Sequence, residues 1–222
     1  MWVKICGITS VEDAAAAAEA GADALGLNLV AGPRLVDGRT AESILSALGA
    51  SVSAVLLTSW ADGRMPDEVS ELLTRFHVPY VQPYGRVTPQ DVAALLTQGV
   101  QTLLVQRVSP ESFPLQTREF LARCGTRWPA AILLDAVGTG RLGGTGRRVD
   151  WNCLAAARQS GACADWPPLI LAGGLTPENV AQAVSVVRPW GVDVSSGVES
   201  SPGHKSPDKM RRFVAAARAA GG

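Results

Sequence analysis

The sequence alternates eight times between a short apolar run and a longer Ala- and Leu-rich segment with helical periodicity. Strands that alternate with helices pair in parallel and carry their helices on the outside, so this pattern predicts an α/β fold. Strands are predicted over residues 2–6, 23–29, 52–57, 80–82, 101–106, 130–134, 168–172 and 191–194. Helices are predicted over residues 10–20, 40–48, 66–75, from 88 onward, 116–123, 151–159, 177–187 and 207–219.

Eight such units in 222 residues, with no obvious linker, fit one compact (β/α)8 TIM barrel domain that spans residues 1–222. The alternative is a doubly wound open sheet. That fold carries a GxGxxG turn after its first strand when it binds a dinucleotide, whereas this chain has Cys6-Gly7-Ile8-Thr9 there. We therefore predict the barrel.

Charge and composition exclude several classes of partner. Twenty basic residues balance twenty acidic ones, so nothing favours nucleic acid or an anionic membrane as a partner. The N-terminus lacks the pattern of a signal peptide, and no apolar run reaches the roughly 18 residues of a membrane span, so we expect a cytoplasmic protein. Four scattered cysteines and two histidines argue against a zinc site and against a disulfide framework. The sequence does not define the oligomeric state.

Two consecutive units near the C-terminus combine an apolar strand, a turn of small residues and a short helical segment. They read LILAGGLTPENV and GVDVSSGVE. Small residues let backbone N–H groups converge, hydroxyls add donors, and a helix start favours negative charge, so both turns predict a phosphate site. The alternative is two ordinary loops that merely need small residues. The residues predicted to bind phosphate here are Gly173, Gly174, Ser195, Ser196 and Gly197.

Three further residues lie where strands end, which in a barrel is the side of the active site. Cys6 ends the first strand, and Lys4 shares its face because side chains alternate with period two. From these two residues alone, a cysteine that only fills space remains the favoured interpretation. Arg34 follows the second strand and offers a planar fork suited to a carboxylate or phosphate, although surface arginines are common.

Asp135 ends the apolar run AAILLDA, where a desolvated carboxyl group suits general acid catalysis. The following loop, residues 136–146, contains five glycines and is predicted to close over a ligand. Its segment around Gly144 is predicted to offer N–H groups to the phosphate. The alternative for this loop is a plain flexible connection.

Five segments together resemble the phosphoribosylanthranilate isomerase family, the (β/α)8 enzymes of tryptophan biosynthesis. The segments are VKICGIT, GADALGL, LLDA…GGTG…DW, LILAGGLTPENV and GVDVSSGVE…PGHKSPDKM. The resemblance implies an Amadori rearrangement of N-(5-phosphoribosyl)anthranilate to 1-(2-carboxyphenylamino)-1-deoxyribulose 5-phosphate. It also implies an aldose–ketose isomerase that uses no metal and no organic cofactor.

The resemblance further implies a role for each matching residue. Asp135 is expected to be the general acid at the ribose ring oxygen, and Cys6 the general base at C2. Arg34 is expected to bind the anthranilate carboxylate. The glycines and serines of the two small-residue turns are expected to hold the phosphate.

Three segments depart from the family pattern, over residues 28–34, 58–60 and 82–85. They lack the usual aromatic-rich stretch with a serine before Pro33, the usual asparagine turn and the usual Gln-Leu-His-Gly. All three are predicted on one side of the barrel mouth. The pattern suits drift within the family. It also suits a paralogue that isomerises a different phosphoribosyl-arylamine, and a non-catalytic barrel that binds a phospho-ligand is the third alternative.

Overall fold

The structure, a computed structural model, describes residues 1–108, 114–136 and 150–222. Its main strands are β1 (Trp2–Cys6), β2 (Ala24–Asn28), β3 (Ser53–Trp60), β4 (Tyr80–Gly85), β5 (Gln101–Val108), β6 (Ala131–Ala136), β7 (Leu169–Leu171) and β8 (Gly191–Val194). Its helices are α1 (Val11–Glu19), α2 (Gly38–Ala47), α3 (Asp67–Arg75), α4 (Pro89–Thr97), α5 (Leu115–Cys124), α6 (Trp151–Gln159), α7 (Val180–Val187) and α8 (Pro207–Ala220).

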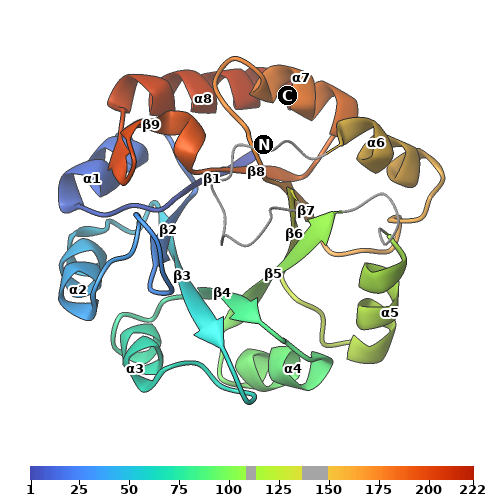
Figure 1. Cartoon of the computed structure of the whole chain (residues 1–222), viewed down its shortest axis with the longest axis horizontal. Helices are drawn as coiled ribbons and strands as arrows, with labels where there is room; N and C mark the ends of the chain where they lie inside the picture. Colours follow the sequence, from blue (N-terminus) through green and yellow to red (C-terminus); the bar gives the residue numbers. More distant parts are fainter. Residues whose placement is uncertain (109–113, 137–149) are drawn as a thin grey trace.

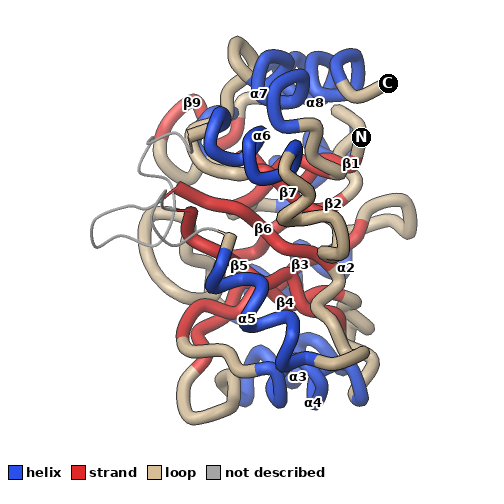
Figure 2. Tube along the Cα trace, turned by 90° about the vertical axis from the view of Figure 1, so that its right-hand side faces the viewer, coloured by secondary structure: helices blue, strands red, loops and turns tan. Residues whose placement is uncertain are grey.

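The strands from β1 to β8 form a closed parallel barrel in sequential order, and β1 pairs with β8 across the seam. Figure 1 looks down the barrel, with the helices arranged as an outer ring. The side view in Figure 2 shows helices on both sides of the tilted strands. The predicted (β/α)8 TIM barrel is confirmed. None of the described helices is long and apolar enough to cross a membrane.

Four strands, β3 to β6, extend further than the sequence predicts, and the extension is longest in β3 and β4. β3 continues to Trp60 and β4 to Gly85, and the added residues pair with each other, Ser59 opposite Tyr84 and Trp60 opposite Gly85. Proline and glycine are rare in strand interiors. The presence of Pro83 and Gly85 is therefore the reason why the sequence suggested an end at residue 82. Since side chains alternate along a strand, the extension places Tyr84 on the same face as Gln82.

Five of the described helices, α1, α2, α4, α6 and α8, begin with a side-chain N-cap. The Ser10 hydroxyl accepts the N–H of Asp13 before α1, and Thr88 and Asp91 form a reciprocal capping box before α4. Helix α2 begins at Gly38, two residues earlier than predicted. The reason is Asp37, whose carboxylate accepts the N–H of Thr40 and so serves as the N-cap.

The interior of the barrel contains apolar side chains and, in addition, a buried ion pair between Lys4 and Asp193. Lys4 of β1 is 0% exposed, and its Nζ donates a hydrogen bond to Asp193 Oδ1 of β8 at 2.8 Å. Gln82 of β4 is also buried. Apolar residues such as Val55 and Leu133 surround these polar groups, while a second apolar cluster fills the space between the strands and the helices.

A short antiparallel hairpin, β9 (Glu199–Ser201) and β10 (His204–Lys205), precedes α8 and was not predicted from the sequence. It lies beside α1 in Figure 1, where the backbone N–H of Lys205 donates to Asp13 Oδ2 at 3.0 Å. Its turn also approaches the loop after β2. A Cβ on Gly203, which has φ +85, would lie 2.7 Å from the carbonyl oxygen of Pro33. The hairpin therefore joins the last β/α connection to the first and second.

Candidate active site

A cavity of about 610 Å³ lies at the C-terminal ends of the barrel strands. Every described residue that the sequence singled out for chemistry or binding lines it. These are Cys6, Arg34, Asp135, Gly173, Gly174, Ser195, Ser196 and Gly197. Gly144 and residues 137–149 lie outside the described part of the chain, so the predicted contribution of that loop stays a prediction.

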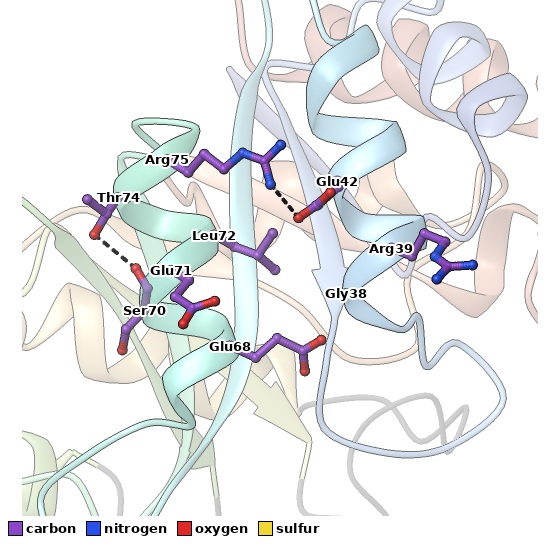
Figure 3. A pocket seen from close by; sticks show the side chains of 9 residues that line it. All are labelled: Gly38, Arg39, Glu42, Glu68, Ser70, Glu71, Leu72, Thr74 and Arg75. Atoms are coloured by element: carbon purple, nitrogen blue, oxygen red, sulfur yellow. Dashed lines mark hydrogen bonds and ion pairs between the residues drawn. The ribbon is translucent and has the colours of Figure 1, made fainter.

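A hollow of about 740 Å³ lies elsewhere, between α2 and α3 on the outside of the barrel (Figure 3). Among the described residues, those that line it all belong to these two helices, and many are charged. Arg75 of α3 reaches across to Glu42 of α2 and pairs with its carboxylate at 2.6 Å. Since barrel enzymes carry their active sites at the C-terminal ends of the strands, the 610 Å³ cavity is the candidate active site. Within the described ranges, no cluster of three or more His, Cys, Asp or Glu side chains is placed to hold a metal ion.

Cys6 is 7% exposed at the end of β1 and lies opposite Gly26 of β2. A Cβ on Gly26 would lie 2.8 Å from Cys6 Sγ and 3.1 Å from Lys4 Nζ, so glycine leaves the space that both groups need. Burial raises the pKa of the Cys6 thiol more than the Lys4 ammonium lowers it, and the Asp193 carboxylate raises it further. Cys6 is therefore a thiol at neutral pH, with a cation beside it.

Lys4 stays charged despite its burial. Burial lowers the pKa of Lys4, but the Asp193 carboxylate opposes this effect, and the pKa of Lys4 is raised overall. The prediction that Lys4 lies on the same face as Cys6 is confirmed by the shared space at Gly26. Sequence reasoning did not single out Asp193. The only signal was an acidic residue at an inward position of the otherwise apolar strand GVDV.

Asp135 is the penultimate residue of β6 and is half-buried at the cavity wall. Tyr84 also lines the cavity, and its hydroxyl accepts a hydrogen bond from Gln82 Nε2 at 2.8 Å. Burial is the main cause that raises the pKa of Tyr84, and the negative charges of the Asp193 and Asp135 carboxylates add to this effect. The phenol is therefore a neutral hydrogen-bond donor close to the predicted acid and base. The sequence had marked this segment only as a departure from the family.

Arg34 follows β2, and its side chain is 13% exposed. Its methylenes cross directly above Gly7, which has φ +76. A Cβ on Gly7 would lie 2.5 Å from Arg34 Cδ, so both the backbone conformation and the space require glycine. The guanidinium is held by Glu199, with Nε donating to Oε1 at 2.6 Å and Nη2 to Oε2 at 2.8 Å. Sequence reasoning missed Glu199, because this contact spans 165 residues.

The two small-residue turns pack against each other. Gly173 and Gly174 follow β7 with φ +82 and +67, and the 3-10 turn η1 (Ser196–Val198) follows β8. A Cβ on Gly197 would collide with the carbonyl oxygen of Leu175, so only glycine allows the turns to lie this close. Asn179 fixes the first turn, since its Nδ2 donates to the carbonyl oxygen of Gly174 at 2.9 Å.

Comparison with known proteins identifies the family. The family model described as N-(5'phosphoribosyl)anthranilate (PRA) isomerase matches residues 3–216. The N-(5'-phosphoribosyl)anthranilate isomerase of Citrifermentans bemidjiense is 41% identical over 217 residues, which cover 97% of this chain and 96% of that protein. The protein of the same name from Chlorobaculum tepidum is 38% identical over 219 residues, covering 98% and 95%.

Solved structures agree with the sequence comparison. Phosphoribosyl anthranilate isomerase from Thermotoga maritima superposes with a TM-score of 0.80 at 32% identity, over 99% of both chains. A phosphoribosyl anthranilate isomerase in complex with reduced 1-(o-carboxyphenylamino)-1-deoxyribulose 5-phosphate gives 0.78 at 30% identity, again over 99% of both. The chain therefore belongs to the N-(5'-phosphoribosyl)anthranilate isomerase family.

Proposed function

We propose that this chain converts N-(5-phosphoribosyl)anthranilate into 1-(2-carboxyphenylamino)-1-deoxyribulose 5-phosphate by an Amadori rearrangement, as an isomerase of tryptophan biosynthesis. The observation that carries the proposal is one cavity at the strand ends that holds a carboxyl group, a thiol, a guanidinium and two small-residue turns. This is the set of groups that the substrate needs, because it combines a phosphate, a ribose ring and an aryl carboxylate. The family relationship supports the same reaction.

The proposed reaction begins with proton transfer from Asp135 to the ribose ring oxygen. The C1–O bond breaks, and the lone pair of the arylamine nitrogen forms a protonated Schiff base at C1. Cys6, acting as a thiolate, then takes the proton from C2, and the electron pair neutralises the iminium to give an enolamine. Transfer of the enol proton to C1 yields the ketone. Acid and base act at different atoms, so two distinct groups are needed, and Asp135 and Cys6 both line the cavity.

The environment of Cys6 matters for this base. A thiolate buried without a cation would be strongly disfavoured, and Lys4 provides that cation from the same strand. The iminium at C1 acidifies the C2 proton, so a modest base is sufficient. Because burial still raises the pKa of Cys6, the reactive thiolate is a minor species at neutral pH, and its fraction rises with pH.

The remaining proposed contacts bind and orient the substrate. The backbone N–H groups around Gly173, Gly174 and Gly197 and the hydroxyls of Ser195 and Ser196 are proposed to hold the phosphate. Gly144 is proposed to add to this site from the loop after β6. Arg34 is proposed to bind the aryl carboxylate. These contacts lie away from the reacting carbons and contribute orientation.

The second candidate function is isomerisation of a different phosphoribosyl-arylamine. The observation that favours it is the position of two departures from the family pattern, since Asn28, Gly32 and Tyr84 all line the cavity. We propose that these residues border the aryl and sugar parts of the substrate. The third alternative, a barrel that binds a phospho-ligand without catalysis, is disfavoured because Cys6 and Asp135 are both present in the cavity.

The test is the loss of substrate fluorescence after addition of enzyme to freshly prepared N-(5-phosphoribosyl)anthranilate. Turnover by the wild type and its loss in Asp135→Asn and Cys6→Ala are expected. Retained turnover in the double variant would refute the acid–base assignment. A folded wild type that binds the reduced product but gives no turnover would favour the second candidate.

A further inference from the structure

We propose that Glu199 and Lys205 are positioning residues that orient Arg34 to receive the aryl carboxylate of the substrate. The inference rests on the proposed function, and it concerns residues that bind the arginine and not the substrate. It makes the β9–β10 hairpin, which the sequence did not predict, part of the substrate-recognition apparatus.

The first argument is the geometry of the Arg34–Glu199 pair. A guanidinium has two edges that can each form a pair of parallel hydrogen bonds with a carboxylate. Glu199 occupies the edge formed by Nε and Nη2, at 2.6 and 2.8 Å. Among the described residues, Nη1 of Arg34 has no hydrogen-bond partner. The end edge, formed by Nη1 and the second N–H of Nη2, is therefore available to a second carboxylate.

The second argument is the link from this pair to the proposed phosphate site. Lys205 is 0% exposed at its side chain, and its Nζ donates to Glu199 Oε1 at 2.9 Å. The same ammonium donates to the backbone carbonyl oxygen of Ser195 at 3.2 Å. Lys205 therefore ties the group that holds Arg34 to the end of β8. The aryl carboxylate site and the phosphate site keep a fixed separation, which suits a substrate that carries both anions.

Charge gives the third argument. Arg34 and Lys205 bring two positive charges, and Glu199 neutralises one of them. One positive charge remains for a ligand. A carboxylate that binds to the free edge of Arg34 completes a balanced cluster of two cations and two anions. Without Glu199, two cations would lie close together in a largely buried place, and their repulsion would displace the arginine.

The hairpin that carries these residues is itself anchored, so the orientation exists before substrate binds. Lys209 Nζ donates to the backbone carbonyl oxygen of Glu199 at 2.7 Å, and the Thr9 hydroxyl donates to that of Gly203. The close approach of Gly203 to Pro33 fixes the hairpin against the loop that carries Arg34. Groups held in this way lose little freedom when the ligand arrives, which favours affinity.

The test compares two ligands. One is reduced 1-(o-carboxyphenylamino)-1-deoxyribulose 5-phosphate, and the other is the same compound without its carboxyl group. Glu199→Asp keeps the charge but is too short to hold Arg34 through both bonds. We expect it to weaken the carboxylated ligand about tenfold or more and to leave the other ligand nearly unchanged. In turnover assays we expect a higher KM with kcat within about threefold of the wild type.

Two further variants separate positioning from charge and from folding. Glu199→Gln combined with Lys205→Met keeps the net local charge and leaves no buried ammonium unpaired, and it should lose the same discrimination between the two ligands. In an Arg34→Met background, Glu199→Asp should cause no additional loss. The matched control is Glu42→Gln, which breaks an exposed Arg–Glu pair on the outer helices (Figure 3) and should change neither ligand.

Equal weakening of both ligands by Glu199→Asp and by the double variant would overturn the proposal, because a general structural defect would explain it. Unchanged discrimination in these variants, when the wild type discriminates strongly, would overturn it as well. Failure of the wild type to bind either ligand would instead refute the proposed function. The two failures are thus distinguishable.

Discussion

Replacing Lys4 by methionine tests the buried ion pair at the centre of the barrel. Methionine keeps the unbranched shape but leaves the Asp193 carboxylate, which is largely buried, without its partner at 2.8 Å. Removing one member of a buried pair costs about 3–5 kcal/mol. For a domain of this size, each kcal/mol lowers Tm by about 2–4 °C, so we expect Tm to fall by about 6–20 °C.

The assay is thermal and denaturant unfolding at neutral pH, with Lys4→Met and Asp193→Asn measured singly and together. If the cost comes from an isolated buried charge, the double variant will be more stable than the sum of the single losses predicts. A loss below about 1 kcal/mol in Lys4→Met would refute this reasoning, as would strict additivity.

The same variant has an expected effect on catalysis. The Lys4 ammonium lowers the pKa of Cys6, against a larger opposing effect of burial, so its removal raises this pKa further. The rising limb of kcat/KM against pH, which reports the base in the free enzyme, should therefore move to higher pH. An unchanged limb in folded Lys4→Met would show that Cys6 is not the titrating base.

Three other predictions concern Tyr84, Gly197 and Glu199. Tyr84→Phe should lower kcat/KM about tenfold or more, because the substrate would lose a hydrogen bond from the phenol. The control Tyr80→Phe, earlier on the same strand, should leave kcat/KM unchanged. Equal kcat/KM values for the two variants would exclude a hydrogen bond between Tyr84 and the substrate. Gly197→Ala should raise KM and cost about 1–3 kcal/mol, because its methyl group collides with the Leu175 carbonyl oxygen, and inorganic phosphate should then inhibit more weakly. Burial opposes ionisation of Glu199, but its bonds to arginine and lysine outweigh this and lower its pKa; the resulting stability is present above its unfolded pKa of about 4.3 and lost as pH falls below it. Unfolding from pH 6 to pH 3 should therefore depend on pH more steeply in the wild type than in Glu199→Gln, and parallel curves would contradict this.

The parts of the molecule that the sequence predicted are those determined by local patterns. The alternation of apolar runs and amphipathic segments predicted the barrel because each strand and helix leaves its own periodicity. The rule that barrel active sites lie at strand ends then selected Cys6, Asp135 and the two small-residue turns, and all of their described members line one cavity. The roles of these residues came from the family resemblance and stay proposals.

What the sequence could not predict depends on contacts between distant segments. Lys4 and Asp193 are 189 residues apart, and their pairing exists only once β8 joins β1. The two hydrogen bonds between the Arg34 guanidinium and the Glu199 carboxylate depend on a hairpin whose residues carry no strong strand pattern. The extension of β4 through Pro83 could not be predicted from the sequence, because the local strand propensity is low there. Pairing with β3 outweighs this low propensity in the folded protein.

The position of the Lys4–Asp193 pair at the seam of the barrel bears on how the chain folds. An incomplete barrel that lacks β8 would carry an ammonium on its inner wall with no counter-charge, and burying that charge alone is costly. Partly assembled forms are therefore penalised, and closure by the last strand removes the penalty in a single step. Folding should accordingly be highly cooperative. In fragments that end before β8, strand β1 should not be stably paired or packed. The Lys4–Asp193 pair therefore favours the closed barrel over partly assembled forms.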